Sequence, residues 1–78
     1  MKTFTTQQVN NAIQLLDKFI LENIKEFNKL ENSEVEYINE DEFDVDVIDY
    51  LKLNNRYNKD GIAIYIEGCD VCIENMNA

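Results

Sequence analysis

The sequence contains no histidine, no tryptophan and no proline, and it has only two glycines. Histidine is the commonest general base and metal ligand in proteins, so its absence removes the usual basis for both kinds of site. The two glycines and the single serine, Ser33, form neither a phosphate-binding loop nor a nucleophile elbow. We therefore expect a protein that is not an enzyme, and we predict no catalytic residue, no metal site and no cofactor.

Positive charge is also scarce, because seven lysines and arginines are outnumbered by sixteen aspartates and glutamates, for a net charge of −9. That sign opposes direct binding of DNA or RNA through phosphates, and it opposes an anionic membrane surface. Long hydrophobic runs are missing too: Asp17, Lys18 and Glu22 interrupt the longest apolar pattern, so no segment is predicted to span a bilayer. Residues 1–11 contain no apolar run typical of a signal peptide, and we expect a cytoplasmic protein.

The chain has 78 residues, of which 45% are hydrophobic, and this is enough apolar material for one small core. We find no internal repeat and no linker between differently composed halves. Residues 1–78 are therefore predicted to form a single acidic α+β domain.

The clearest pattern is an amphipathic helix predicted over residues 6–30. Its apolar side chains recur every three or four residues and so share one face: Val9, Ile13, Leu16, Ile20, Ile24 and Phe27. Thr5 is placed to cap the first turn, and Gln8, three residues later, completes the pattern of a capping box. Further apolar residues widen the stripe beyond a coiled-coil seam, which predicts a helix lying across a sheet.

Residues 43–53 fit two kinds of element. Phe43, Val45 and Val47 alternate with aspartates, and their β-branched members favour a strand. The alternation changes phase at Val47, so a bulge in a long strand or a helix beginning near Val47 would also fit. We predict a strand and keep the helix as the alternative.

The other segments after the first helix predict a small antiparallel sheet. Residues 34–38 alternate like a strand, and residues 39–42 are predicted to form the turn that follows. Residues 54–61 form a predicted loop, residues 62–66 a buried strand, and Gly68 closes a hairpin to a last strand. The predicted fold class is α+β, with one N-terminal amphipathic helix packed on a three- or four-stranded antiparallel sheet.

Nine of the sixteen acidic residues lie within residues 31–49, a stretch without lysine or arginine. Such concentrated charge destabilises a fold by repulsion, which favours a functional reason for keeping it. On a strand, Asp44 and Asp46 would lie on one face with Cα atoms about 6.6 Å apart, and a row of such groups imitates a nucleic-acid backbone. We predict a partner-binding surface made of Glu36, Glu40, Asp41, Glu42, Asp44, Asp46 and Asp49. The alternative is a solvated surface that only keeps the protein soluble.

Cys69 and Cys72 form a C-x-x-C pair. One such pair supplies half of a structural zinc site, and the chain has no histidine to complete it. A redox pair is expected at the start of a helix, whereas these cysteines precede a β-like tail. We interpret them as two small residues of the core or of the sheet edge; a zinc ion or disulfide shared across a dimer is the alternative.

The loop that begins at Arg56 partly matches the calcium loop of an EF-hand, with Asn58, Asp60, Gly61 and Glu67 at the matching positions. Its first position requires a carboxylate, but the guanidinium of Arg56 repels calcium. The alternating isoleucines that follow predict a strand where an EF-hand has its second helix. We therefore interpret Asp60 and Gly61 as a plain turn.

The chain is rich in asparagine, isoleucine and lysine, a usage typical of AT-rich genomes. Together with small size and acidity concentrated in one segment, this composition resembles that of the phage-encoded acidic inhibitors that mimic nucleic acids, including anti-CRISPR proteins. The residues that carry the resemblance are Glu36, Glu40, Asp41, Glu42, Asp44, Asp46 and Asp49. It implies that the acidic face fills a Lys/Arg-lined channel of a nuclease or CRISPR complex in the host cytoplasm and excludes the nucleic acid.

Two other functions fit the same sequence. An antitoxin or immunity protein would use the same acidic surface to neutralise a basic toxin. A homodimeric structural protein would use the extra apolar positions of the helix or a free strand edge. The expected partner is thus a basic protein or nucleoprotein complex, or, in the last case, a second copy of the chain.

Overall fold

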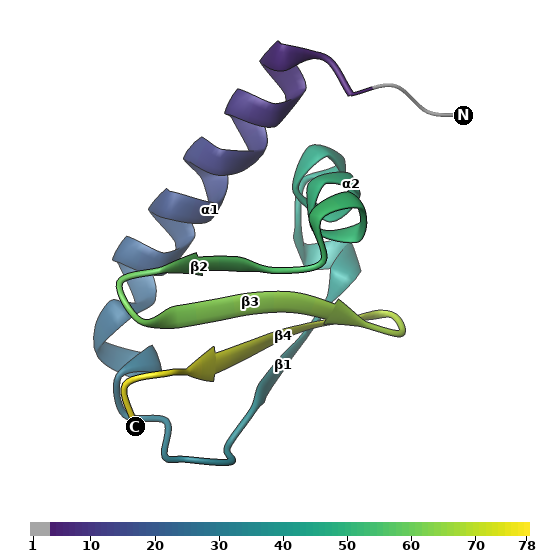
Figure 1. Ribbon diagram of the computed structural model, residues 1–78. Helices are drawn as coiled ribbons and strands as arrows, with labels where there is room; N and C mark the ends of the chain where they lie inside the picture. Colours follow the sequence, from purple (N-terminus) through teal and green to yellow (C-terminus); the bar gives the residue numbers. More distant parts are fainter. Residues whose placement is uncertain (1–3) are drawn as a thin grey trace.

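The longest element is the N-terminal helix α1 (Thr6–Phe27), shown in a computed structural model that describes residues 4–78 (Figure 1). Its predicted capping box is confirmed: the Gln8 N–H donates to Thr5 Oγ1 at 3.1 Å, and the Thr5 N–H donates to Gln8 Oε1 at 3.0 Å. The helix ends at Phe27, earlier than predicted. The amide of Asn75, at the end of the last strand, donates to the carbonyls of Asn28 and Leu30, so the chain is held in a turn there.

The sheet has four antiparallel strands in the order β1-β4-β3-β2. They are β1 (Glu36–Asn39), β2 (Tyr57–Lys59), β3 (Ile62–Glu67) and β4 (Asp70–Asn75). The predicted α+β fold and its antiparallel sheet are therefore correct. The strands do not follow each other across the sheet in chain order, because β1 pairs with the last strand, β4, and lies at the opposite edge from β2.

Two tight turns connect β2, β3 and β4. Gly61 and Gly68 both have positive φ, at 81° and 65°, which glycine adopts without steric cost. The predicted turn at Asp60 and Gly61 and the predicted hairpin at Gly68 are both confirmed. The predicted loop of residues 54–61 is partly wrong, because β2 lies within it and pairs with β3.

The predicted strand over residues 43–53 is wrong, because this segment forms the helix α2 (Val45–Asn54). Val47, Ile48 and Leu51 are buried and share one helical face, whereas Val45, which the alternation placed in the sheet, is 64% exposed. Packing of that face against α1 and β3 overrides the β-propensity of the valines. The alternative of a helix is the correct one.

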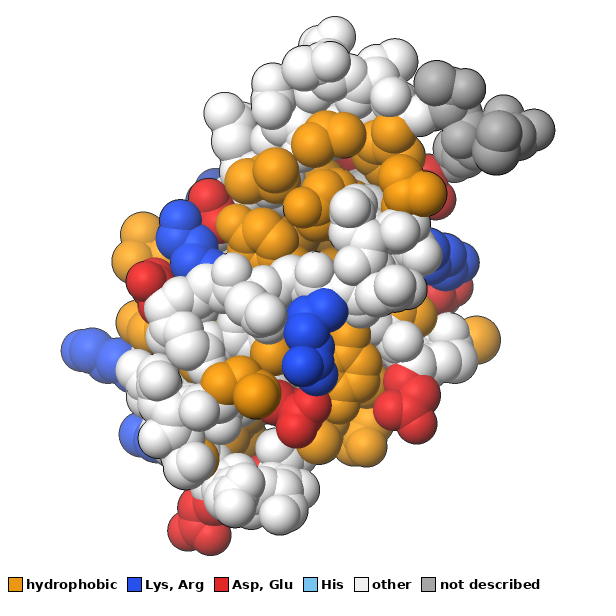
Figure 2. Space-filling view, viewed as in Figure 1, with side chains coloured by type: hydrophobic (Ala, Val, Ile, Leu, Met, Phe, Trp, Pro, Cys, Tyr) orange, Lys and Arg blue, Asp and Glu red, His pale blue; other side chains and the backbone are white. Residues whose placement is uncertain are grey.

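Both helices cover the same face of the sheet (Figure 1). The core there consists of Ala12, Leu16, Ile20, Phe27, Val47, Ile48, Leu51, Ile62, Ile64, Val71 and Ile73. Among residues 4–78, no helix is long and apolar enough to cross a membrane. On the face shown in Figure 2, charged side chains of both signs are scattered, and hydrophobic side chains are exposed between α1 and α2.

Candidate functional site

Three of the predicted site residues form the short 3-10 helix η1 (Glu40–Glu42), directly after β1. Asn39 caps it, because its Oδ1 accepts the Asp41 N–H at 2.9 Å. The Glu40 N–H donates to the carbonyl of Cys69 at 3.0 Å, so η1 is anchored to the β3–β4 turn. Asp41 and Glu42 are exposed, whereas Glu40 is half-buried and its Oε2 is buried without a hydrogen-bond partner among residues 4–78.

Asp44 and Asp46 do not form the predicted row along a strand. Asp44 is the N-cap of α2 and its Oδ1 accepts the Asp46 N–H at 2.9 Å. Asp46 lies in the first turn, is half-buried, and its Oδ2 accepts the amide of Asn11 on α1 at 3.0 Å. Both carboxylates face the positive end of the α2 dipole, so they stabilise the fold as well as carry charge.

The structure brings together five of the seven predicted residues. Glu40, Asp41 and Asp49 line one hollow of about 310 Å³, and Glu42 and Asp44 line a neighbouring one. Phe43 lines both hollows, so they are adjacent. We call Glu40, Asp41, Glu42, Asp44 and Asp49 the acidic surface. Glu36 lies apart from it at the start of the edge strand β1, and Asp46 is turned toward α1.

Most carboxylates of the acidic surface have no basic partner within residues 4–78. Three of the six lysines and arginines of residues 4–78 pair with acids elsewhere, in Lys29–Glu26 at 3.7 Å, Arg56–Glu74 at 3.5 Å and Lys59–Asp17 at 3.1 Å. Within the same residues, Glu40, Asp41, Glu42 and Asp44 form no ion pair. Lys52 is the basic residue that lines the hollow with Glu40 and Asp41. The exposed carboxylates of Asp41, Glu42 and Asp44 therefore leave net negative charge on this surface.

No family model, curated protein or solved structure matches the chain. The candidate site therefore depends on the geometry of this protein alone.

An apolar groove, which was not among the sites predicted from the sequence, adjoins the acidic surface. It has a volume of about 370 Å³ and is lined by Leu15, Leu16, Phe19, Ile38, Glu42, Phe43, Asp44 and Val47. The Phe19 and Phe43 rings meet edge to face, with centroids 5.1 Å apart. The sequence signal for this groove is the wide apolar stripe of the first helix. Leu15 and Phe19 belong to that stripe and are only half-buried.

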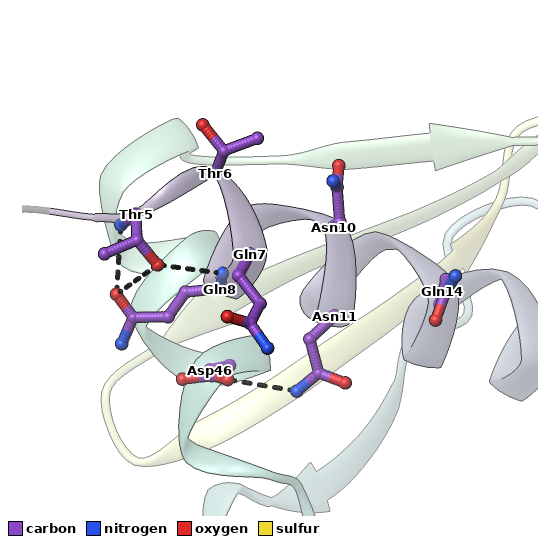
Figure 3. Close-up of a pocket in the computed structure, with 8 residues that line it drawn as sticks. All are labelled: Thr5, Thr6, Gln7, Gln8, Asn10, Asn11, Gln14 and Asp46. Carbon is purple, nitrogen blue, oxygen red and sulfur yellow. Dashed lines mark hydrogen bonds between the residues drawn. The ribbon is translucent and has the colours of Figure 1, made fainter.

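A larger hollow of about 680 Å³ lies along the first turns of α1 (Figure 3). Its lining is uncharged except for Asp46: Thr5, Thr6, Gln7, Gln8, Asn10, Asn11, Gln14 and Asp46. Figure 3 shows two separate hydrogen-bonded pairs: Thr5 with Gln8, which cap α1, and Asn11 with Asp46, which join α1 to α2.

The two cysteines are free and differently placed. Cys69 is exposed in the β3–β4 turn, whereas Cys72 on β4 is buried. Burial, with smaller contributions from Glu67 and Asp70, raises the pKa of the Cys72 thiol, so this thiol resists deprotonation. Residues 4–78 contain no cluster of three or more groups that would hold a metal ion.

The residues of the partial EF-hand match lie in a hairpin. Asn58 is on β2, Asp60 and Gly61 form the turn, and Glu67 ends β3. Arg56 stacks over the ring of Tyr65, 5.0 Å from its centroid, and pairs with Glu74. A hydrogen bond to Glu74, together with burial, raises the pKa of Tyr65 to about 12. Arg56, Tyr65 and Glu74 therefore form one polar cluster on the outer face of the sheet.

Proposed function

We propose that this protein inhibits a partner by placing its acidic surface in a basic, nucleic-acid-binding groove and so excluding nucleic acid. The observation that carries the proposal is the lack of ion pairs at Glu40, Asp41, Glu42 and Asp44 within residues 4–78. Unneutralised carboxylates of one sign attract lysines and arginines and accelerate association. The partner is a basic nuclease or nucleoprotein complex, such as a CRISPR complex, in the cytoplasm of a host cell.

The corrected fold changes the geometry of this mimicry. Glu40, Asp41 and Glu42 are consecutive in the 3-10 helix η1, and the next acid lies at the start of α2. The acids therefore do not form a straight row along a strand. A compact cluster of this kind fits a local concentration of lysines and arginines in the groove better than it fits a long stretch of the groove. The protein itself is proposed to bind no nucleic acid and to catalyse no reaction.

The apolar groove favours a second candidate, an antitoxin- or immunity-type module that binds a basic toxin. Specific protein interfaces combine an apolar centre with a charged rim, and the groove beside the acidic surface offers both. The two candidates differ in whether nucleic acid competes for the same surface of the partner.

The test is a comparison of three immobilised proteins against purified basic nucleases and host lysate. The first is the wild type, and the second carries Glu40→Gln, Asp41→Asn and Glu42→Gln. The third is a control with the same charge change at exposed residues elsewhere: Glu22→Gln, Asp60→Asn and Glu67→Gln.

A nucleic-acid mimic retains its partner on the wild type and on the control, and loses it on the second protein. Added duplex DNA or RNA releases the partner, and raising salt from about 50 to about 200 mM weakens the complex because screening shortens the range of the attraction. Release by salt but not by nucleic acid supports the antitoxin-type module. Equal retention on all three proteins contradicts any role for the acidic surface.

A further inference from the structure

The apolar groove lies between α1 and the segment that runs from η1 into α2. Leu16 and Val47 are 1% and 2% exposed and form its floor. Leu15, Phe19 and Phe43 are only half-buried and form its walls. A depression of about 370 Å³ with mostly apolar walls and few polar groups is typical of sites that bury one or two large side chains of a ligand.

The charged groups that line the groove are both carboxylates, Glu42 and Asp44. Within residues 4–78 neither forms an ion pair. Asp44 uses one oxygen to cap α2, which fixes the direction of its side chain at the rim. An apolar floor with a negative rim is complementary to an apolar side chain that has positive neighbours.

We propose that the groove binds a peptide segment of the partner in which an aromatic or aliphatic anchor is flanked by lysine or arginine. This inference rests on the proposed function, because it specifies how a basic partner is held. The anchor lies in the groove against the Phe19 and Phe43 rings, which contact each other, and its cationic neighbours reach Glu42 and Asp44. Anchors of this kind dominate the affinity of protein interfaces, whereas rim charges mainly set association rate and choice of partner.

Charge separates this occupant from the other candidates. A second copy of the chain carries a net charge of −9, so it would bring like charges to the rim. Nucleic acid would bring phosphates to the same two carboxylates. A basic segment alone turns both rim charges into favourable contacts.

The test uses two synthetic peptides of about 15 residues and equal positive charge. In one, Lys and Arg flank a Leu and a Trp; in the other, Ala replaces both anchors. Affinity is measured by fluorescence anisotropy, and the site is mapped from amide chemical shifts of the labelled protein.

Two variants of the protein receive the same substitution on α1. Leu15→Arg places a cation in the groove, whereas Leu21→Arg, at a residue that is 73% exposed and outside the groove lining, is the control. Glu42→Gln with Asp44→Asn removes the rim charge and keeps the helix cap, so it serves if Leu15→Arg does not fold.

We expect the anchored peptide to bind at least about tenfold more tightly than the alanine peptide, with shifts centred on Leu15, Phe19 and Phe43. Leu15→Arg, or the rim variant, reduces the affinity about tenfold or more, and Leu21→Arg leaves it within about twofold. Equal affinity for both peptides, or equal affinity of Leu15→Arg and Leu21→Arg, overturns the proposal. Shifts at the groove that depend on protein concentration without peptide overturn it in favour of a second copy.

Failure here is distinguishable from failure of the proposed function. If both peptides bind equally and salt weakens both, the groove has no role and the acidic surface keeps its role. If the variant with Glu40→Gln, Asp41→Asn and Glu42→Gln retains its captured partner fully, the proposed function itself is wrong.

Discussion

At the scale of single residues, Asp17 joins the first helix to the edge strand β2. Its carboxylate accepts the hydroxyl of Tyr57 and pairs with Lys59 at 3.1 Å. The hydrogen bond from Tyr57 lowers the pKa of Asp17, with a smaller contribution from Lys59, although burial opposes the shift. Burial and the bond to Asp17 raise the pKa of Tyr57 well above its usual range. The two shifts describe one contact that favours ionised Asp17 and protonated Tyr57.

Removing the hydroxyl in Tyr57→Phe is expected to lower the free energy of unfolding by about 1–2 kcal/mol near neutral pH, as for hydrogen bonds to a charged group that water partly screens. Because the pKa of Asp17 is lower in the folded state, its contribution is fully present above the unfolded value of about 3.9 and is lost as the pH falls through the folded value. The difference between wild type and variant should therefore shrink below about pH 4.

Urea denaturation at several pH values measures this difference. Tyr50→Phe is the matched control, because Tyr50 packs edge to face against Tyr57 but shows no hydrogen bond from its hydroxyl among the described residues. Equal losses in the two variants, or a loss at Tyr57 that does not depend on pH, would show that the contact with Asp17 contributes nothing measurable.

At the scale of the elements, α2 begins at a carboxylate that has two roles. Asp44 caps the helix through the Asp46 N–H and also lies on the rim of the groove. Loss of the cap and loss of the charge can therefore be separated by the choice of substitution.

Asp44→Ala is expected to reduce the free energy of unfolding by about 1 kcal/mol, because the N–H at the start of α2 loses its acceptor. Asp44→Asn should leave stability nearly unchanged, since asparagine caps helices about as well as aspartate. Chemical denaturation compares the two. An equal loss in both variants would mean that the charge, acting on the helix dipole, stabilises α2 more than the cap does.

The first helix holds the sheet through a small number of fully buried side chains. Ile20 is 1% exposed within the core, whereas its neighbour Leu21 is 73% exposed. Ile20→Ala should cost about 2–5 kcal/mol through lost burial and the cavity that remains. Leu21→Ala should change stability by less than about 0.5 kcal/mol. Denaturation midpoints of the two variants test the packing face, and an unchanged midpoint for Ile20→Ala would refute it.

At the scale of the whole molecule, the net charge of −9 is unevenly distributed and opposes folding. The molecule measures 38 × 23 × 18 Å. Electrostatic forces reach about 30 Å at 0.01 M salt but only about 8 Å at physiological salt. At low salt the acidic surface therefore repels acids throughout the protein, and at physiological salt mainly those beside it.

The variant with Glu40→Gln, Asp41→Asn and Glu42→Gln is expected to be more stable than the wild type by about 0.5–1 kcal/mol at low salt, because it relieves local repulsion. Its advantage should decrease at about 0.5 M salt, where the charges are screened. Thermal unfolding at both salt concentrations measures the effect. A less stable variant would show that these carboxylates make stabilising contacts that outweigh their repulsion.

Local sequence patterns determined the first helix with its capping box, the strands on either side of Gly68, and the concentration of acids before residue 50. Each of these depends on neighbours within about four residues, such as Thr5 with Gln8 or the alternating Ile62 and Ile64. The fold class followed from those elements. That the acidic surface binds a partner stays a prediction.

Only the tertiary structure decided whether residues 43–53 form a strand or a helix. The alternation around Val45 fits a strand, and the spacing of Val47 and Leu51 fits a helix, so local pattern cannot choose between them. Burial of Val47 and Leu51 against α1 and β3 makes the helix more favourable. That choice turned Asp46 toward Asn11, gathered the acids around η1 and opened the groove next to them. Contacts between residues far apart in the sequence provide the free energy that favours the helix, so no short window of the chain predicts it.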